Sequence, residues 1–189
     1  TALDGANDLA WDSGKVASSE QYGVMYAGAA LEKTTEYWWK VRTWDGQGQA
    51  SPWSDARRFI TSFFKPEDWN AQAAWIGDEL GTVPPKAPAP QFRKEFQINK
   101  PIRGAYLYIC GLGQFTALIN GAKVGDHVMD PAWTDYDITS DYVTFDVTSM
   151  VGQGSNAIGV NLANGWLSHT RDKQSTRNFG PMRMIEQLH

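Results

Sequence analysis

The stretch Phe115-Thr-Ala-Leu-Ile-Asn-Gly-Ala-Lys-Val124 decides the fold of this chain. Asn120 and Gly121 form the pair most typical of a two-residue β-hairpin turn, because both central positions of that turn require a positive φ. The stretch therefore predicts two antiparallel strands that are joined at these residues.

Further strands are expected around this hairpin, because apolar and polar residues alternate over short segments that end in turn residues. Ile158, Val160 and Leu162 are expected to face inward. The expected strands cover residues 91–98, 102–110, 142–148, 156–162 and 181–188. Antiparallel strands at this spacing predict a jelly-roll-like antiparallel β-sandwich.

The first third of the chain also has the pattern of strands. Strands are expected over residues 21–27, 37–43 and 57–61, with a turn at Asp45-Gly-Gln-Gly48. One face of the second of these strands carries a mixed set of cations and aromatics, whose long stems can cover the rings. This set consists of Trp38, Lys40, Arg42 and Trp44.

A connector separates the two parts. Pro66 is placed to open a short helical turn near its start, and four prolines between Gly81 and Pro90 predict an exposed extended loop. We therefore expect an all-β chain with a first domain over residues 1–63, a linker over 64–74 and a second domain over 75–189.

Composition excludes several classes of function. The net charge is −4 and the cations are scattered, which argues against nucleic acid and membrane surfaces as partners. No apolar run approaches the roughly 20 residues of a membrane span. Cys110 is the single cysteine, so a disulfide framework and a zinc knuckle are excluded, and its place in a strand predicts a buried, inert thiol. Nine Trp, seven Tyr and eight Phe favour strands, and their flat faces also suit sugar rings.

Three ordered stretches of the second domain resemble one family. They are Gly111-Leu-Gly-Gln-Phe115 with the hairpin up to Asp126, Asp130-Pro-Ala-Trp-Thr-Asp-Tyr136 with residues 142–148, and residues 154–166, which end in Asn-Gly-Trp. Together they resemble the N-terminal β-sandwich domain of bacterial α-L-rhamnosidases. The resemblance covers about residues 75–189.

The first domain is similar to the fibronectin-type-III-like domain that precedes this sandwich in many such enzymes. Leu31 and Tyr37 have the spacing of the tyrosine-corner region, and the remaining likeness lies in residues 11–16, 37–44 and 51–54. A complete domain of this type takes roughly 90–100 residues. We therefore expect a partial domain here, a truncated strand at the C-terminus, and a fragment that begins inside its parent.

The resemblance implies a parent enzyme that releases terminal L-rhamnose with inversion, using an acidic pair on a separate helical barrel further along the chain. No such barrel is encoded here, so no catalytic residue is assigned. The implied partners are the downstream catalytic domain and rhamnose-containing oligosaccharides, and a periplasmic or secreted location is favoured over a cytoplasmic one. Some related modules bind rhamnose with calcium, but no calcium ligand set can be mapped onto this sequence.

A local acidic pair is the alternative source of chemistry. Asp126, Asp130 and Asp135 cluster beside Trp133 and Tyr136. Because Asp also hydrogen-bonds its own backbone in turns, structure or ligand contact is the preferred role for them. His127 and His169 lack the spacing of metal ligands.

The preferred ligand contacts lie on two loops, where binding residues concentrate. The substrate-binding candidates are Trp133, Asp135, Tyr136, Asn164 and Trp166. If the two loops share one end of the sandwich, they offer stacking faces with carboxylate and amide groups. The competing interpretation is that both tryptophans pack against a neighbouring domain. We expect a non-catalytic support for the catalytic domain, with a stand-alone carbohydrate-binding or adhesin-type protein as the alternative.

Overall fold

The computed structural model describes residues 9–20, 22–69, 73–77, 89–163, 165 and 182–188, the last of these as backbone. The chain divides into two compact units, Thr1–Asp68 (unit 1) and Trp69–His189 (unit 2). Apart from the 3-10 turn η1 (Pro66–Asp68), the elements of the described residues are β-strands. The predicted all-β class is therefore confirmed, and so is the short helical turn at Pro66.

Unit 1 contains a two-stranded antiparallel sheet of β1 (Glu36–Trp39) and β2 (Arg57–Ile60). Tyr37 lies opposite Phe59, and their rings stack at 5.7 Å. Among the described residues of this unit, Thr61 alone is buried. The unit therefore has no buried apolar core in its described part.

In place of a buried core, hydrogen bonds to the backbone of Glu32 and Thr35 hold the start of β1 in position. The Tyr37 hydroxyl accepts from the Glu32 N–H at 2.9 Å, which is the type of bond that its spacing from Leu31 predicts. The Thr61 hydroxyl lies 2.5 Å from the Glu32 carbonyl and accepts from the Thr35 N–H at 2.9 Å. The Thr61 hydroxyl thus satisfies two backbone groups, the carbonyl of Glu32 and the N–H of Thr35.

The predicted strand over residues 37–43 ends early, at Trp39. Beyond it, the hydroxyls of Ser54 and Ser51 accept from the N–H groups of Val41 and Thr43, both at 3.1 Å. Serine side chains therefore replace backbone carbonyls in the ladder, which is why the regular strand stops there. The predicted turn at Asp45 is confirmed, because Gly48 N–H donates to the Asp45 carbonyl at 3.0 Å.

A cation–π ladder runs over the surface of unit 1. The Arg42 guanidinium lies 4.4 Å from the ring centre of Trp53 and 5.0 Å from that of Trp44. Lys40 lies over Trp53 at 5.0 Å and Lys15 over Trp44 at 5.7 Å. The predicted covering of aromatic rings by long cationic side chains is confirmed for Arg42 and Lys40, and each contact adds electrostatic attraction to the packing.

The predicted strand over residues 21–27 is wrong, because residues 22–27 form no strand. Tyr26 fixes this segment through its side chain. Its hydroxyl donates to the Ala29 carbonyl at 2.6 Å, and its ring packs edge-on against Trp11 at 5.2 Å. Tyr22 and Met25 are more than four-fifths exposed, so the alternating pattern has no buried face here.

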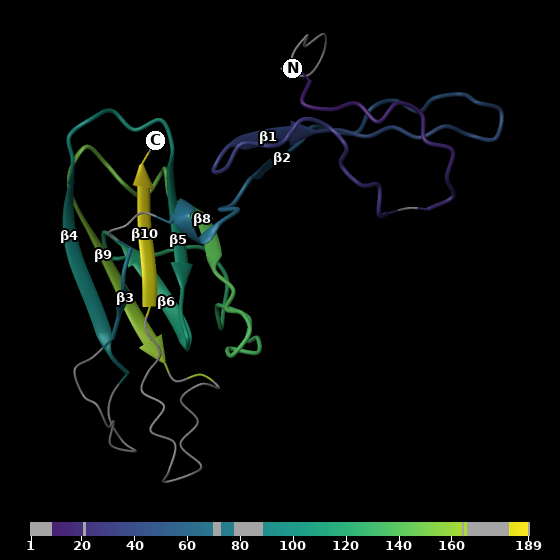
Figure 1. Ribbon diagram of the computed structural model, residues 1–189. Helices are drawn as coiled ribbons and strands as arrows, with labels where there is room; N and C mark the ends of the chain where they lie inside the picture. The colour runs from purple at the N-terminus through teal and green to yellow at the C-terminus, as the bar shows by residue number, and fades with distance from the viewer. Residues whose placement is uncertain are drawn as a thin grey trace. The chain divides into compact units, whose positions relative to one another are not determined.

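Unit 2 contains two four-stranded antiparallel sheets (Figure 1). The strands of the first, in spatial order, are β3 (Trp75–Ile76), β10 (Met182–Leu188), β5 (Ala105–Cys110) and β8 (Val143–Asp146). Those of the second are β4 (Gln91–Ile98), β9 (Gly154–Ala163), β6 (Gln114–Ile119) and β7 (Ala122–Lys123). The predicted antiparallel sandwich is thus confirmed, although β5 begins three residues later than expected.

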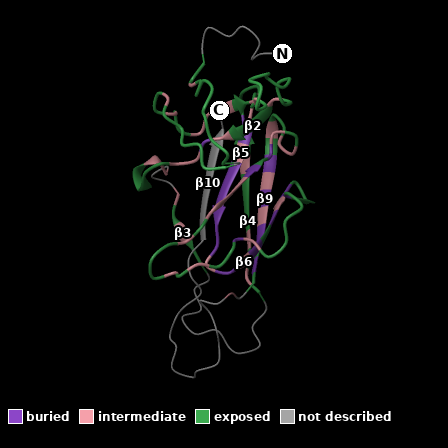
Figure 2. Cartoon of the chain, turned by 90° about the vertical axis from the view of Figure 1, so that its right-hand side faces the viewer, coloured by how far each residue is buried: buried purple, intermediate pink, exposed green. Residues whose placement is uncertain are grey.

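The core of unit 2 lies between these sheets, and it receives side chains from both of them. Leu107, Ile109 and Phe145 enter from one sheet, while Phe115 and the inward residues of β9 enter from the other. The predicted inward positions of β9 are confirmed, since Ile158, Val160 and Leu162 are 6%, 2% and 2% exposed. Figure 2 shows buried residues along β5 and β9 and exposed residues around β2.

The Asn120–Gly121 hairpin joins β6 to β7 as predicted, with φ values of 51° and 85°. The Asn120 side chain also bridges to the rest of the unit. It donates to the Met150 carbonyl and to Asn156 Oδ1 at 3.0 and 2.9 Å, and it accepts from the Ala157 N–H at 2.9 Å. Asn156 is itself 3% exposed, so its amide forms a buried polar junction that the sequence did not predict.

Unit 2 begins with Trp69, a residue of the predicted linker. Its ring packs edge-on against Tyr142 at 5.1 Å, and Tyr142 lies 6.3 Å from Tyr108. Burial of Tyr108, followed by its proximity to Tyr142 and Tyr106, raises the pKa of its hydroxyl to about 12. Most of the expected proline-rich loop over 81–90 lies outside the described residues.

Candidate functional site

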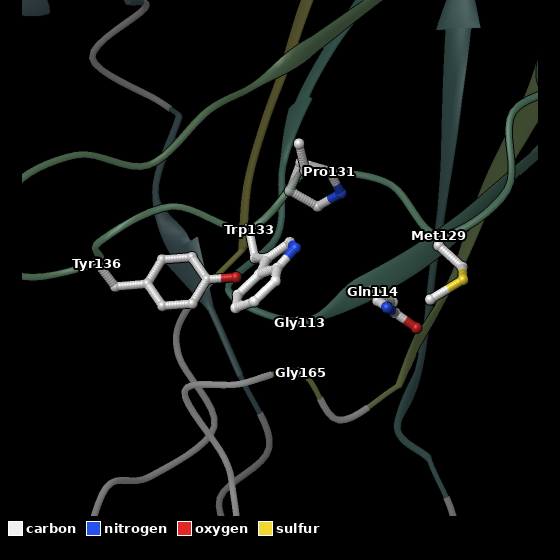
Figure 3. Close-up of a pocket in the computed structure, with 8 residues that line it drawn as sticks. Gly113, Gln114, Met129, Pro131, Trp133, Tyr136 and Gly165 are labelled. Carbon is white, nitrogen blue, oxygen red and sulfur yellow. The ribbon is translucent and has the colours of Figure 1, made fainter.

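One pocket of unit 2, with a volume of about 440 Å³, lies where β6 begins and β9 ends (Figure 3). Gly113 and Gln114 contribute the start of β6, and Gly165 follows β9. The loop between β7 and β8 contributes Met129, Pro131, Ala132, Trp133 and Tyr136. In the view of Figure 3, Trp133 and Tyr136 stand to one side of Gly113, with Gln114 and Met129 to the other. The pocket therefore joins three segments that are far apart in the sequence.

Glycine is required where the first and third of these segments meet. A Cβ atom on Gly165 would lie 2.9 Å from the Gly113 Cα. A Cβ atom on Gly113 would collide with the Ala163 carbonyl oxygen. The two backbones can approach this closely only without side chains, so the pair forms a backbone wall of the pocket.

The segment before Pro131 is anchored at Asp130. Its carbonyl accepts from the Phe115 N–H at 2.8 Å, and its carboxylate lies 3.0 Å from His127 Nδ1. The His127 ring packs at 5.4 Å from Phe145. These contacts position Met129, whose φ is 62°, and Pro131, which follows a cis peptide bond, at the pocket.

Asp135 forms the hydrogen bonds that make a turn in the segment from Trp133 to Thr139. The Asp135 carbonyl accepts from the N–H groups of Ile138 and Thr139 at 2.9 and 2.8 Å. One oxygen of its carboxylate accepts from the Asp137 N–H at 3.2 Å. This turn chemistry is typical of Asp, and it presents Trp133, which is 66% exposed, beside the half-buried Tyr136. Burial, together with the nearby Cys110, raises the pKa of Tyr136 above its ordinary value.

The structure brings together only part of the predicted set of ligand contacts. Trp133 and Tyr136 line the pocket, whereas Asp135 is not among the lining residues. Asn164 and Trp166 lie outside the described residues, and Gly165 between them lines the same pocket as Trp133 and Tyr136. Gln114 and Met129 were not predicted, because the sequence alone does not reveal which distant segments converge.

The described lining residues supply no acidic pair. No carboxylate belongs to the described lining residues, whereas an inverting glycosidase needs two of them about 6.5–9.5 Å apart. Among the other acidic candidates, Asp126 is exposed and Asp130 is held by His127. Within the described ranges no cluster of His, Cys, Asp and Glu could hold a metal ion. Cys110 is buried, as predicted.

No helix in the described ranges has the length and apolarity that crossing a membrane requires. Apart from η1, the regular elements of the described part are β-strands, and a pocket lies at one end of the sandwich of unit 2. The class of the chain is that of all-β modules in which a rigid two-sheet scaffold supports a loop-built pocket.

The family follows from comparison with known proteins. Residues 2–65 match the Rha78A-like, N-terminal immunoglobulin domain. Residues 100–189 match the alpha-L-rhamnosidase N-terminal domain. The chain therefore corresponds to the N-terminal region of α-L-rhamnosidases, with their immunoglobulin-like domain followed by their N-terminal β-sandwich domain.

Individual relatives agree with this assignment. An alpha-L-rhamnosidase of Formosa agariphila is 36% identical over 95% of this chain, which spans 21% of that relative. The structure of alpha-L-rhamnosidase from Dictyoglumus thermophilum has a TM-score of 0.80 and 36% identity, over 98% of this chain and 23% of that one. The alpha-L-rhamnosidase of Aspergillus terreus has a TM-score of 0.73 and 34% identity, over 85% and 19%. The chain thus spans about a fifth of the length of these relatives.

Proposed function

We propose that this chain is the non-catalytic N-terminal part of an α-L-rhamnosidase and that it supports the catalytic domain of its parent. The observation that carries the proposal is the match of nearly the whole chain to about a fifth of each relative. The lining of the unit 2 pocket supports a non-catalytic role, because its described residues supply no acidic pair.

The backbone wall at Gly113 and Gly165 and the core of unit 2 suit a supporting role. A close-packed interior transmits strain and deforms little, so a sandwich of this kind can hold a neighbouring domain in a fixed position. Sugar contact by the loop that carries Trp133 and Tyr136 is compatible with that role, because this loop lies at one end of the sandwich.

The proposal can be tested by a domain exchange in the Dictyoglumus thermophilum α-L-rhamnosidase. One variant lacks the region that matches this chain, a second carries this chain in its place, and a third carries an unrelated β-sandwich of similar size. Hydrolysis of an aryl α-L-rhamnoside and thermal inactivation are measured for each variant, and for this chain by itself.

We expect no turnover by this chain alone, loss of activity or of heat resistance in the deletion variant, and recovery with this chain but not with the unrelated sandwich. Equal recovery with the unrelated sandwich would contradict the proposal. Turnover by this chain alone that disappears on Asp130→Asn would instead favour a local catalytic carboxylate.

A further inference from the structure

The cation–π ladder of unit 1 gathers positive charges that are scattered in the sequence. The cationic groups of Lys15, Lys40 and Arg42 lie over the rings of Trp44 and Trp53, at 4.4–5.7 Å from the ring centres. These residues come from three separate stretches of the chain. The ladder is therefore a cationic surface that the fold assembles.

The charge of the ladder is accessible to a ligand. Lys15 and Arg42 are exposed, and in the described part of the chain neither of them forms an ion pair. A guanidinium that lies over aromatic rings still has N–H donors along its edge, and these suit the paired oxygens of an oxyanion. The ladder thus offers an anion two charges that no carboxylate of the described residues neutralises.

The acidic side chains that neighbour the ladder in sequence have different roles. Asp12 and Asp45 each accept hydrogen bonds from backbone N–H groups of their own turns, and Glu36 pairs with Arg58 at 2.9 Å. Asp55 is exposed, so its charge opposes that of the ladder. An anion would therefore be held by short-range contacts with the ladder rather than by the net charge of unit 1.

An exposed aromatic side chain continues this surface along the chain. Trp38 is 49% exposed, and its indole N–H donates to Glu36 at 2.8 Å. Serine hydroxyls and backbone hydrogen bonds keep the segment paired beyond β1. Because side chains alternate between the faces of an extended chain, Trp38, Lys40 and Arg42 share one face at intervals of about 6–7 Å. A flat ring is thus followed by cations at a spacing comparable with the length of a sugar ring.

We infer that Trp38 and the cation–π ladder, together the unit 1 strip, bind an anionic glycan. A sugar C–H face would lie on Trp38, and a carboxylate or sulfate group would bind Arg42 and the neighbouring lysines. The choice of a glycan rests on the proposed function, because an α-L-rhamnosidase acts on sugar chains. A nucleic acid also combines flat rings with anions, but it carries a charge on every unit, and the net charge of −4 opposes such a polyanion.

The test is affinity electrophoresis of the whole chain in gels that contain polygalacturonic acid, dextran sulfate or neutral dextran. We expect at least one of the two anionic polymers to retard the chain and neutral dextran not to do so. Added salt should reverse the retardation, because it screens contacts between exposed charges. Retardation by one anionic polymer alone would identify the preferred oxyanion as carboxylate or as sulfate.

Substitutions in the unit 1 strip should change the affinity in both directions. Arg42→Ala should weaken binding by about tenfold or more, and Lys15→Gln by about threefold. Asp55→Asn should strengthen binding by about twofold, a gain that a loss of fold cannot imitate. Arg57→Ala is the matched control, because Arg57 is exposed and pairs with Trp39 on the opposite face of the sheet.

Circular dichroism of each variant separates lost binding from lost fold. The inference is overturned if neither anionic polymer binds, if neutral dextran binds as tightly, if Trp38→Ala binds normally, or if Arg57→Ala weakens binding as much as Arg42→Ala. A single-stranded oligonucleotide that binds more tightly than both polymers, with the same loss in Arg42→Ala, would overturn it in favour of nucleic acid. Glycan binding with a failed domain exchange would refute the supporting role alone. A successful exchange without glycan binding would refute this inference alone.

Discussion

The two units are stabilised in different ways. Unit 2 has twelve buried apolar residues in one cluster between two sheets, whereas the described part of unit 1 has a single buried residue, Thr61. Unit 1 compensates at its surface, through the cation–π ladder and the hydrogen bonds around Glu32 and Thr35.

The difference has a consequence for cooperativity. Burial between two sheets couples many residues at once, so the loss of one core side chain affects the whole of unit 2. Surface contacts act over short distances, and their effects add when the residues share no partner. We therefore expect unit 2 to respond strongly to single substitutions and unit 1 to respond weakly and locally.

The largest expected effect is in the core of unit 2. Ile109→Ala removes a side chain that is 0% exposed and should lower the free energy of unfolding by about 2–5 kcal/mol. Met25→Ala in unit 1 removes a side chain that is 81% exposed and should change it by less than about 0.5 kcal/mol. Urea unfolding followed by near-ultraviolet circular dichroism measures both. Similar losses for the two variants would refute the contrast.

Loss of the polar junction around Asn156 in unit 2 should have the next largest effect on stability. The Asn156 amide donates to the Gly152 and Gly154 carbonyls and accepts from the Gly152 N–H. Asn156→Ala leaves these groups and Asn120 without that partner, so we expect a loss of about 1–3 kcal/mol. Gln91→Ala, at an exposed position of β4, is the control in the same unfolding experiment. An unchanged midpoint for Asn156→Ala would show that water replaces the amide fully.

The ladder of unit 1 should have a smaller effect. Arg42→Ala removes two cation–π contacts at exposed sites, each of about 0.5–1 kcal/mol, so unit 1 should lose about 1–2 kcal/mol while unit 2 keeps its stability. Arg42→Lys should keep only part of the stabilisation that Arg42 provides, because lysine lacks the planar guanidinium. Hydrogen exchange of unit 1 amides measures the change. Arg57→Ala serves as a control, since the ladder does not include Arg57.

Asp68→Asn should have the smallest effect on the stability of unit 1 at neutral pH. The hydrogen bond from Lys33 at 2.7 Å, followed by the Phe64 N–H, lowers the pKa of the Asp68 carboxyl below its ordinary value of 3.8. A carboxyl with a lowered folded-state pKa stabilises unit 1 above pH 3.8, and this contribution is lost as the pH falls through the folded-state value. Asp68→Asn should therefore flatten the acid limb of unit 1 stability, measured by hydrogen exchange between neutral and acid pH. An identical limb in both proteins would contradict this assignment.

Much of unit 2 could be predicted because its signals are local. The Asn120–Gly121 turn and the alternation in β9 each depend on neighbouring residues, and the structure confirms both. The prediction failed at residues 21–27, where an alternating pattern looks the same whether or not a second strand is present to pair with it. The Tyr26 ring there packs against Trp11 rather than into a core.

The pocket was predictable only in part, for a related reason. Trp133 and Tyr136 could be selected as aromatic residues in one polar loop. Gln114 and Met129 become pocket residues because the start of β6, the loop before Pro131 and the end of β9 meet in space. The role of Asp135 could be read from the sequence in two ways, and in the structure it makes the hydrogen bonds of a turn residue.

We expect the side-chain hydrogen bonds of Asn120 to slow deamidation in the Asn120–Gly121 hairpin as well. In a mobile Asn-Gly sequence the backbone nitrogen of the glycine can attack the side-chain carbonyl of the asparagine, release ammonia and leave a cyclic imide, which water opens to aspartate or isoaspartate. In the folded chain the Asn120 amide is hydrogen-bonded to Met150, Asn156 and Ala157, so we expect it to reach the attacking geometry less often than in the unfolded chain. Each unfolding event removes this protection, and an aspartate formed there could no longer donate to Asn156 on refolding. The fraction of aspartate in the hairpin peptide, measured by mass spectrometry after storage in urea and in native buffer, would record how often unit 2 has opened.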